Sequence, residues 1–292
     1  MDIFAVFFSH PINLALTCLI LGLIVGSFLN VVIYRLPIMM ENEWQDQCCD
    51  LLEIDDKKPE ELFNLAQPAS SCPHCKHKIK PWENIPVVSF LFLKGRCSNC
   101  DAPIALRYPI IELLSGILSA FIALRVGYGI ELLLVLILTW FLIALTMIDF
   151  DHKLLPDQLT LPLLWLGLIA NSFELFASLD SAVWGAIAGY LSLWSLYWAF
   201  KLITGKDGMG YGDFKLFAAF GAWMGWQALP LIILLSSLVG AIVGVSLILF
   251  RGRDRNIPIP FGPFLAVAGW ITLFWSGPIL SAYYRLAGLP LN

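Results

Sequence analysis

The sequence predicts an all-α polytopic membrane protein with about eight transmembrane helices and one small polar loop domain. Three observations carry this prediction. Of the 292 residues, 59% are hydrophobic and only 14% are charged, and the mean hydropathy is +0.77. The apolar residues form long continuous runs, and a helix that crosses a bilayer needs roughly 20 of them. Lipid offers the backbone no hydrogen-bond partner, so continuous runs of this kind predict helices rather than a barrel of short alternating strands.

Eight apolar runs are long enough to be considered as spans. The first run lacks a small-residue cleavage site and is therefore predicted to be a span rather than a removed signal peptide. The sixth is short and rich in glycine, so we expect it to be tilted, broken or partly buried in protein. The predicted spans are residues 12–34, 108–126, 130–148, 158–178, 182–204, 214–227, 229–250 and 261–284.

The distribution of basic residues among the loops predicts the orientation of these spans. If the N-terminus lies outside, the inner loops are 35–107, 149–157, 205–213 and 251–260. These loops and their flanks hold all of the 18 Lys and Arg residues except Arg125 and Arg285. Lys and Arg concentrate in cytoplasmic loops, so the sequence predicts an outside N-terminus and a cytoplasmic 35–107 loop. The net charge of −4 gives no reason to expect a nucleic-acid partner.

The loop 35–107 is large enough to form a small domain, which divides the chain into a first helix (1–34), the loop (35–107) and a seven-helix membrane domain (108–292). Part of the loop, 41–61, carries nine acidic residues against Lys57 and Lys58: Glu41, Glu43, Asp46, Asp50, Glu53, Asp55, Asp56, Glu60 and Glu61.

Two C-x-x-C pairs lie in this loop, Cys72–Cys75 and Cys97–Cys100. Two such knuckles can complete a tetrahedron of thiolates around zinc, with no coordination position left open, so the metal is expected to be structural. Disulfides are the first alternative, but cytoplasmic thiols stay reduced. A thioredoxin-like redox site would need a βαβ pattern, which the sequence lacks. His74 and His77 are possible substitute ligands. No role is predicted for Cys18, Cys48 or Cys49.

Two aspartates fall at the cytoplasmic boundary of predicted spans. Asp149 ends the third span and Asp213 precedes the sixth, so both are expected at the same membrane depth. Ionisable groups at that depth tend to face a protein interior or a wet cavity. Two carboxylates that meet there can share one proton, because like charges at close range push their pKa values apart. Such a pair supplies a base to activate water and an acid to protonate a leaving group.

Glycines surround the second aspartate in the run Gly208-Met-Gly210-Tyr-Gly212-Asp213. Gly210 and Gly212 have no Cβ, so the backbone can bend sharply and another chain can approach closely. A peptide must be extended to be cut, and a Gly-rich turn before the aspartate fits that need. The same run is weak support for nucleotide binding, because no strand precedes it.

Other interpretations of the aspartates remain open at this stage. Asp213 could cap its helix, and Asp149 could pair with Lys153 or Lys215. Three further carboxylates lie on the same predicted surface and could belong to a catalytic pair instead: Asp151, Asp157 and Asp207.

The sequence is less consistent with three other functions. A zinc metallopeptidase needs an H-E-x-x-H motif, which is absent. A proton-relaying transporter needs acids near mid-membrane, and Glu112, the nearest example, lies near a span end. A non-catalytic membrane assembly factor with a structural zinc loop leaves the Gly-rich Asp213 turn unexplained.

Six segments, taken in order, resemble the type IV prepilin peptidases, a family of bifunctional leader peptidases and N-methyltransferases of bacterial inner membranes. The resemblance covers essentially the whole chain. It rests on 26–32 (Gly-Ser-Phe-Leu-Asn-Val-Val), both cysteine knuckles, the Asp149 segment through Leu155-Pro156-Asp157, 210–213 (Gly-Tyr-Gly-Asp) and 258–263 (Pro-Ile-Pro-Phe-Gly-Pro).

The resemblance implies that Asp149 and Asp213 are the catalytic pair. It implies cleavage of a short basic leader from prepilins and pseudopilins at the cytoplasmic face, followed by methylation of the new N-terminal residue with S-adenosylmethionine. It also links the cysteine loop, and Gly95 in particular, to methylation. No methyltransferase motif stands out, so the S-adenosylmethionine site is not predicted. As a hypothesis, the acids of 41–61 attract the basic leader; the alternative is a solvated acidic surface.

Overall fold

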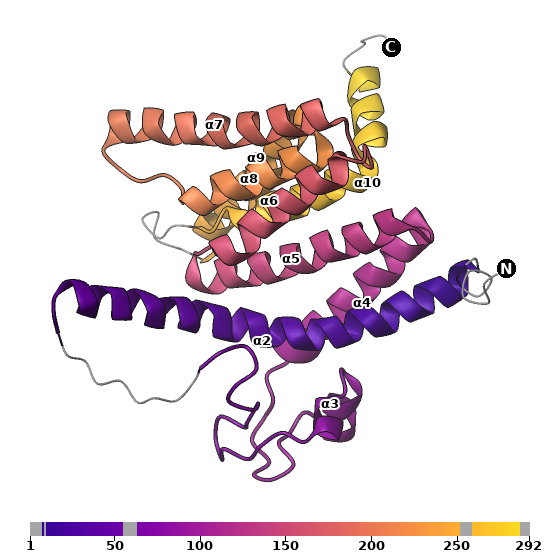
Figure 1. Cartoon of the computed structure of the whole chain (residues 1–292), viewed down its shortest axis with the longest axis vertical. Coiled ribbons are helices and arrows are strands. Elements are labelled where there is room, and N and C mark those ends of the chain that lie inside the picture. Colours follow the sequence, from indigo (N-terminus) through magenta and orange to yellow (C-terminus); the bar gives the residue numbers. More distant parts are fainter. Residues whose placement is uncertain (1–7, 9, 55–62, 252–258, 287–292) are drawn as a thin grey trace. The chain divides into compact units, whose positions relative to one another are not determined.

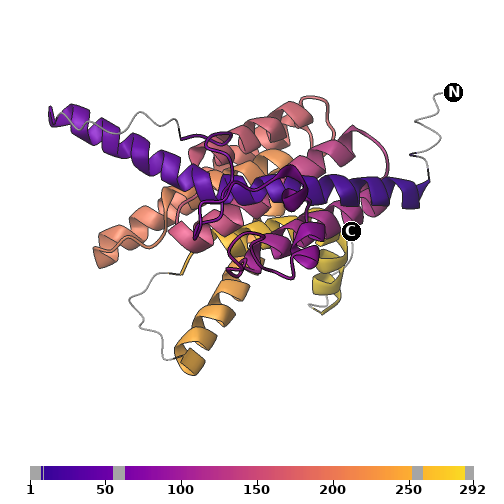
Figure 2. The same ribbon diagram turned by 90° about the horizontal axis from the view of Figure 1, so that it is seen from below.

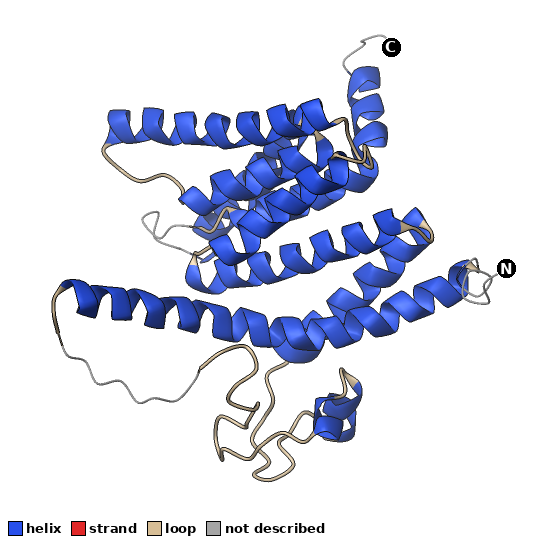
Figure 3. Cartoon of the chain, viewed as in Figure 1, coloured by secondary structure: helices blue, strands red, loops and turns tan. Residues whose placement is uncertain are grey.

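The computed structural model describes residues 8, 10–54, 63–251 and 259–286 (Figure 1). Within these residues, helices and turns make up the fold, apart from two isolated bridges between extended residues (Figure 3). Six of the described helices are long and apolar enough to cross a membrane. The all-α, multi-pass fold class is thereby confirmed, while two of the eight predicted spans correspond to shorter helices.

The chain divides into two compact units, 1–144 and 145–292. In the first unit, α2 (Pro11–Leu51) packs along α4 (Arg107–Val126). Small residues allow the close approach: a methyl group on Gly26 would lie 2.8 Å from Cα of Glu112. Contacts of this kind, through small residues, are typical of helix pairs in membranes. The first part of α5 (Ile130–His152) follows, and Trp140 donates a hydrogen bond to Ser119 of α4 at 3.1 Å.

One face of α2 is both apolar and exposed, as expected for a helix in contact with lipid. Apolar side chains recur every four residues and remain more than half exposed within the protein, namely Ile12, Leu16, Ile20, Ile24 and Phe28. Spacing of four residues keeps side chains on one face of a helix. An exposed apolar stripe of this length would be unfavourable in water and is favourable against lipid.

α2 does not stop at the predicted end of the first span but continues to Leu51, through Pro37. Residues 38–51 include two Met, two Glu and two Gln, which favour helix over loop, and neither Gly nor Pro. The first half of the acidic stretch therefore lies on an exposed helix. Asp55, Asp56, Glu60 and Glu61 lie outside the described residues.

The loop domain follows, with a 3-10 turn η1 (Pro81–Asn84) and a short helix α3 (Val88–Phe92). Figure 2 shows this domain in front of the middle of α2. The predicted boundaries 1–34, 35–107 and 108–292 stay a prediction.

The second unit is built around α8 (Tyr211–Met224), the short Gly-rich span of the sequence prediction. Every residue from Asp213 to Trp223 except Lys215 is buried. α8 packs against α6 (Asp157–Asn171), α7 (Leu179–Thr204) and α10 (Gly262–Leu286), while α9 (Leu229–Arg251) packs mainly against α10. The expectation that this segment is buried in protein is correct, because its neighbours cover it on several sides.

Candidate active site and metal centre

Asp149 lies in the last turn of α5, inside the second unit, and its side chain is buried. The backbone N–H of Gly262, the first residue of α10, hydrogen-bonds its carboxylate. Its Oδ2 is buried and has no hydrogen-bond partner among the described residues. A buried carboxylate oxygen without a partner is costly, which marks this position as one that a proton, water or substrate is expected to complete.

Asp213 lies in the first turn of α8 and is also buried. Its Oδ2 accepts a hydrogen bond from the backbone N–H of Gly210 at 3.1 Å. The capping interpretation is therefore correct for one oxygen. The second oxygen, Oδ1, is buried without a hydrogen-bond partner, so capping leaves half of the carboxylate available.

The two carboxylates lie beside glycines that both pack against Leu155, Gly262 next to Asp149 and Gly212 directly before Asp213. They come from positions 64 residues apart in sequence. Two buried like charges at short range favour a state in which one proton is shared between them. One ionised and one protonated carboxyl is the arrangement that can accept a proton and donate another in the same reaction.

One alternative partner of Asp149 and two of the other carboxylates on this surface are engaged elsewhere. Lys215 pairs with Asp157, with Nζ 2.6 Å from Oδ1 and 2.7 Å from Oδ2. Asp207 is hydrogen-bonded by Tyr197 and paired with Lys201. Asp151, Asp157 and Asp207 are exposed, whereas Asp149 and Asp213 are buried. Burial and unpartnered oxygens single out these two among the carboxylates of this surface.

Leu155 brings the segments around the aspartates together. A methyl group on Gly212 would lie 2.6 Å from Cβ of Leu155, and one on Gly262 would lie 3.1 Å from its Cδ1. Gly212 thus leaves room for Leu155. Gly210 begins the helix with an extended backbone and has no positive φ. The sequence reasoning assigned no role to Gly262, although 258–263 was one of the segments that carried the resemblance.

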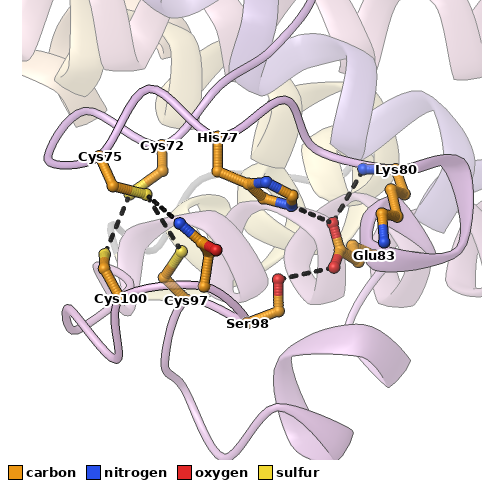
Figure 4. A network of polar contacts seen from close by, with 9 residues as sticks. Cys72, Cys75, His77, Lys80, Glu83, Cys97, Ser98 and Cys100 are labelled. Carbon is orange, nitrogen blue, oxygen red and sulfur yellow. Dashed lines mark hydrogen bonds and ion pairs between the residues drawn. The ribbon is translucent and has the colours of Figure 1, made fainter.

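The four cysteines of the two knuckles gather at one point of the loop domain (Figure 4). Their sulfur atoms all lie within 4.8 Å of one another. Sγ of Cys72 is 3.8 Å from Sγ of Cys100, and Sγ of Cys75 is 3.9 Å from Sγ of Cys97. Tetrahedral zinc with Zn–S bonds of about 2.3 Å places its sulfurs about 3.8 Å apart. The donor set therefore fits zinc, and all four thiols are free of disulfide bonds.

The surroundings of Cys75 favour its thiolate form. The backbone N–H of His77 and the side-chain amide of Asn99 lower the pKa of the Cys75 thiol to about 6. Among the described residues, the ligand cluster contains neither His74 nor His77. Nε2 of His77 instead lies 3.6 Å from Oε2 of Glu83.

Glu83 links the two knuckles, as Figure 4 shows. Its Oε2 accepts the backbone N–H of Lys80 at 2.9 Å, and its Oε1 accepts the hydroxyl of Ser98 at 2.7 Å. These two donors lower the pKa of Glu83, so it is ionised at neutral pH and holds both halves of the loop.

Gly95 precedes the second knuckle in a left-handed conformation, with φ of +69°. A methyl group there would lie 3.0 Å from Cζ of Phe90. Both the backbone conformation and the contact with Phe90 favour glycine at this position.

Two family models match successive parts of the chain. A family model described as the bacterial peptidase A24 N-terminal domain matches residues 20–126, and one described as the type IV leader peptidase family matches residues 136–245. No solved structure matches.

Curated relatives named prepilin leader peptidase/N-methyltransferase align over nearly the whole chain. The one from Stutzerimonas stutzeri is 56% identical, over 96% of this chain and 97% of the relative. The one from Aeromonas hydrophila is 59% identical, over 90% and 91%. The one from Legionella pneumophila is 48% identical, over 96% and 97%.

Proposed function

We propose that this chain, which belongs to the type IV leader peptidase family, removes the leader peptide of type IV prepilins and pseudopilins and then methylates the new N-terminus. The names of the relatives support both activities. They do not favour the alternative of a non-catalytic assembly factor.

The observation that carries the peptidase proposal is the pair of buried carboxylates, each with one oxygen that lacks a hydrogen-bond partner. In the proposed reaction, the ionised carboxylate accepts a proton from water as the water oxygen bonds to the scissile carbonyl carbon. The protonated carboxyl donates its proton to the leaving amide nitrogen, and the C–N bond breaks. This is general acid–base catalysis by Asp149 and Asp213.

The methylation proposal needs a methyl donor, and S-adenosylmethionine supplies the methyl group for the freed N-terminal amine. The loop domain, with Gly95, is the part of the chain that we associate with this second activity. No pocket of the described residues is assigned to the donor.

The metal proposal is a structural zinc ion held by Cys72, Cys75, Cys97 and Cys100. The sulfur separations fit zinc, and four thiolates leave no open position for a substrate. The ion would fix the two knuckles and the Gly95 turn between them.

For location, we propose the bacterial inner membrane, with the N-terminus on the periplasmic side and both the aspartates and the zinc loop on the cytoplasmic side. The distribution of Lys and Arg supports this orientation. A prepilin helix would then arrive through the lipid with its basic leader at the depth of Asp149 and Asp213. The exposed acids Glu41, Glu43, Asp46 and Asp50 on α2 could attract that leader.

Reconstitution tests the two activities together. The purified chain in liposomes is given a prepilin and S-adenosylmethionine, and the pilin N-terminus is followed by mass spectrometry. We expect loss of the leader first and addition of one methyl group second. An uncut prepilin, or methylation of the uncut form, would contradict the proposal.

A further inference from the structure

Two charged side chains of the α2–α4 pair are buried and hydrogen-bonded to the backbone of the loop domain. Arg35 of α2 is 7% exposed and Glu112 of α4 is 8% exposed. A buried charge is costly unless its hydrogen-bonding capacity is well used. The proposed peptidase chemistry uses neither residue. The burial of these two side chains therefore needs another explanation, which their hydrogen bonds to the loop domain provide.

Arg35 holds the segment that leads into the first knuckle. Its Nη1 donates to the carbonyl of Asn64 at 2.9 Å and its Nη2 donates to the carbonyl of Pro68 at 2.6 Å. The guanidinium also lies over the ring of Phe63, 5.7 Å from its centroid. Within this segment, the Asn64 side chain accepts the backbone N–H groups of residues 66 and 67 and folds it into a turn. The planar guanidinium of Arg35 thus holds this turn in one orientation relative to α2.

Glu112 holds the segment between the knuckles. Its Oε2 accepts the backbone N–H of Val87 at 2.8 Å, and the hydroxyl of Ser27 hydrogen-bonds the same carboxylate. Close packing at Gly26 brings α2 to the Glu112 backbone. Val87 has a φ of +61°. A β-branched residue in this region is strained and persists only where its surroundings hold it.

α3 connects this contact to the Gly95 turn. It begins directly after Val87, and the N–H of Gly95 bonds to the carbonyl of Phe90 at 2.9 Å. The carbonyl of Gly95 in turn accepts the N–H of Ile104 at 2.8 Å, beyond the second knuckle. The position of Val87 therefore sets the position of α3, and α3 sets the position of Gly95.

We infer that Arg35 and Glu112 form a two-point clamp that holds the zinc loop in one orientation on the α2–α4 pair, and that methylation depends on this clamp while leader cleavage does not. The inference rests on the proposed function, in which the loop serves methylation. Both residues act as positioning residues: Arg35 fixes the approach to the first knuckle, and Glu112 fixes the start of α3.

The experiment compares Glu112→Ala, Glu112→Gln and Arg35→Met in liposomes. Cleavage of prepilin and methylation of pre-cut pilin are measured separately on the same samples. Trypsin cutting at the exposed loop lysines Lys76 and Lys78 reports the conformation of the loop without any substrate. Glu131→Ala, which removes a half-buried carboxylate at the start of α5, and Arg125→Met, which removes an exposed arginine of α4, are the matched controls.

We expect Glu112→Ala and Arg35→Met to lower methylation by roughly 10- to 100-fold, because small displacements of a positioned site are costly. Cleavage should stay within about twofold of the wild type, which also shows that the variants are folded. Trypsin should cut the loop faster. Glu112→Gln keeps an acceptor oxygen for Val87 and should retain methylation, as should both controls.

Several results would overturn the clamp. One is faster tryptic cutting with unchanged methylation, since the loop orientation would then be irrelevant. Another is a Glu112→Gln variant as inactive in methylation as Glu112→Ala, since the carboxylate itself would then be needed. Equal losses of both activities would make the two residues general determinants of folding. A wild-type chain that never methylates pre-cut pilin would instead refute the proposed function, and the tryptic comparison would still test the clamp.

Discussion

The first residue of α10, Gly262, lies against the carboxylate of Asp149, so that a methyl group on Gly262 would be 2.6 Å from Oδ2. Oδ2 is the buried oxygen of Asp149 that has no hydrogen-bond partner. The lack of a side chain at residue 262 thus keeps the space in front of this oxygen open and lets the backbone N–H approach the carboxylate.

Replacing Gly262 by Ala is predicted to displace the Asp149 carboxylate and to lower the rate of leader cleavage. A shift of about 1 Å at a reacting group can cost on the order of 100-fold in rate. Initial cleavage rates with a saturating prepilin substrate provide the measurement. Gly277→Ala, in the same helix, is the matched control, because a methyl group there has no neighbour within 4 Å. Wild-type cleavage by Gly262→Ala would show that the close approach has no role.

Tyr197 is predicted to stabilise the loop before Asp213. Its hydroxyl donates to Oδ1 of Asp207 at 2.5 Å and accepts from Nζ of Lys201 at 3.0 Å, and its ring lies 5.4 Å from that of Tyr211. Tyr197→Phe should lower the midpoint of thermal unfolding, because it removes both hydrogen bonds of the hydroxyl. Thermal unfolding in detergent measures the change, with Tyr190→Phe in the same helix as the control. An equal midpoint for Tyr197→Phe and wild type would refute this role.

Zinc content is predicted to depend on the knuckle cysteines. Cys72→Ser together with Cys75→Ser removes half of the thiolate donors, and a site with two remaining sulfurs should lose the ion. Metal analysis of the purified chain should give one zinc ion per wild-type chain and a strongly reduced amount for the double variant. Cys48→Ser, at an exposed free cysteine outside the cluster, should keep its zinc. Undiminished zinc in the double variant would exclude the site.

Local patterns were sufficient to predict the helices and the cysteine centre. Apolar runs locate helices because the bilayer imposes both their length and their backbone hydrogen bonding. The two C-x-x-C pairs predict their own convergence, since each pair already holds two donors on one turn. The end of α2 was missed because Pro37 and the acids of 41–53 are typical of a loop, whereas the helix continues through them to Leu51.

Long-range contacts could not be predicted in the same way. That Glu112 meets the backbone of Val87, or that Gly262 meets Asp149, depends on how segments far apart in the chain pack. No spacing or composition encodes such a contact. Asp149 and Asp213 could be predicted from the sequence because the predicted topology places both at one depth and the family resemblance singles them out, whereas their partners could not.

The proposed catalytic pair is tested most directly by replacing Asp149 and Asp213 singly with Asn and following the cleavage of a prepilin in membranes. Asn keeps the size of the side chain but can neither take up nor release the proton that each step requires. We expect each variant to lose cleavage by several orders of magnitude while it still methylates pre-cut pilin, which shows that the chain is folded. Removal of the leader by both variants at the wild-type rate would contradict the two-aspartate mechanism.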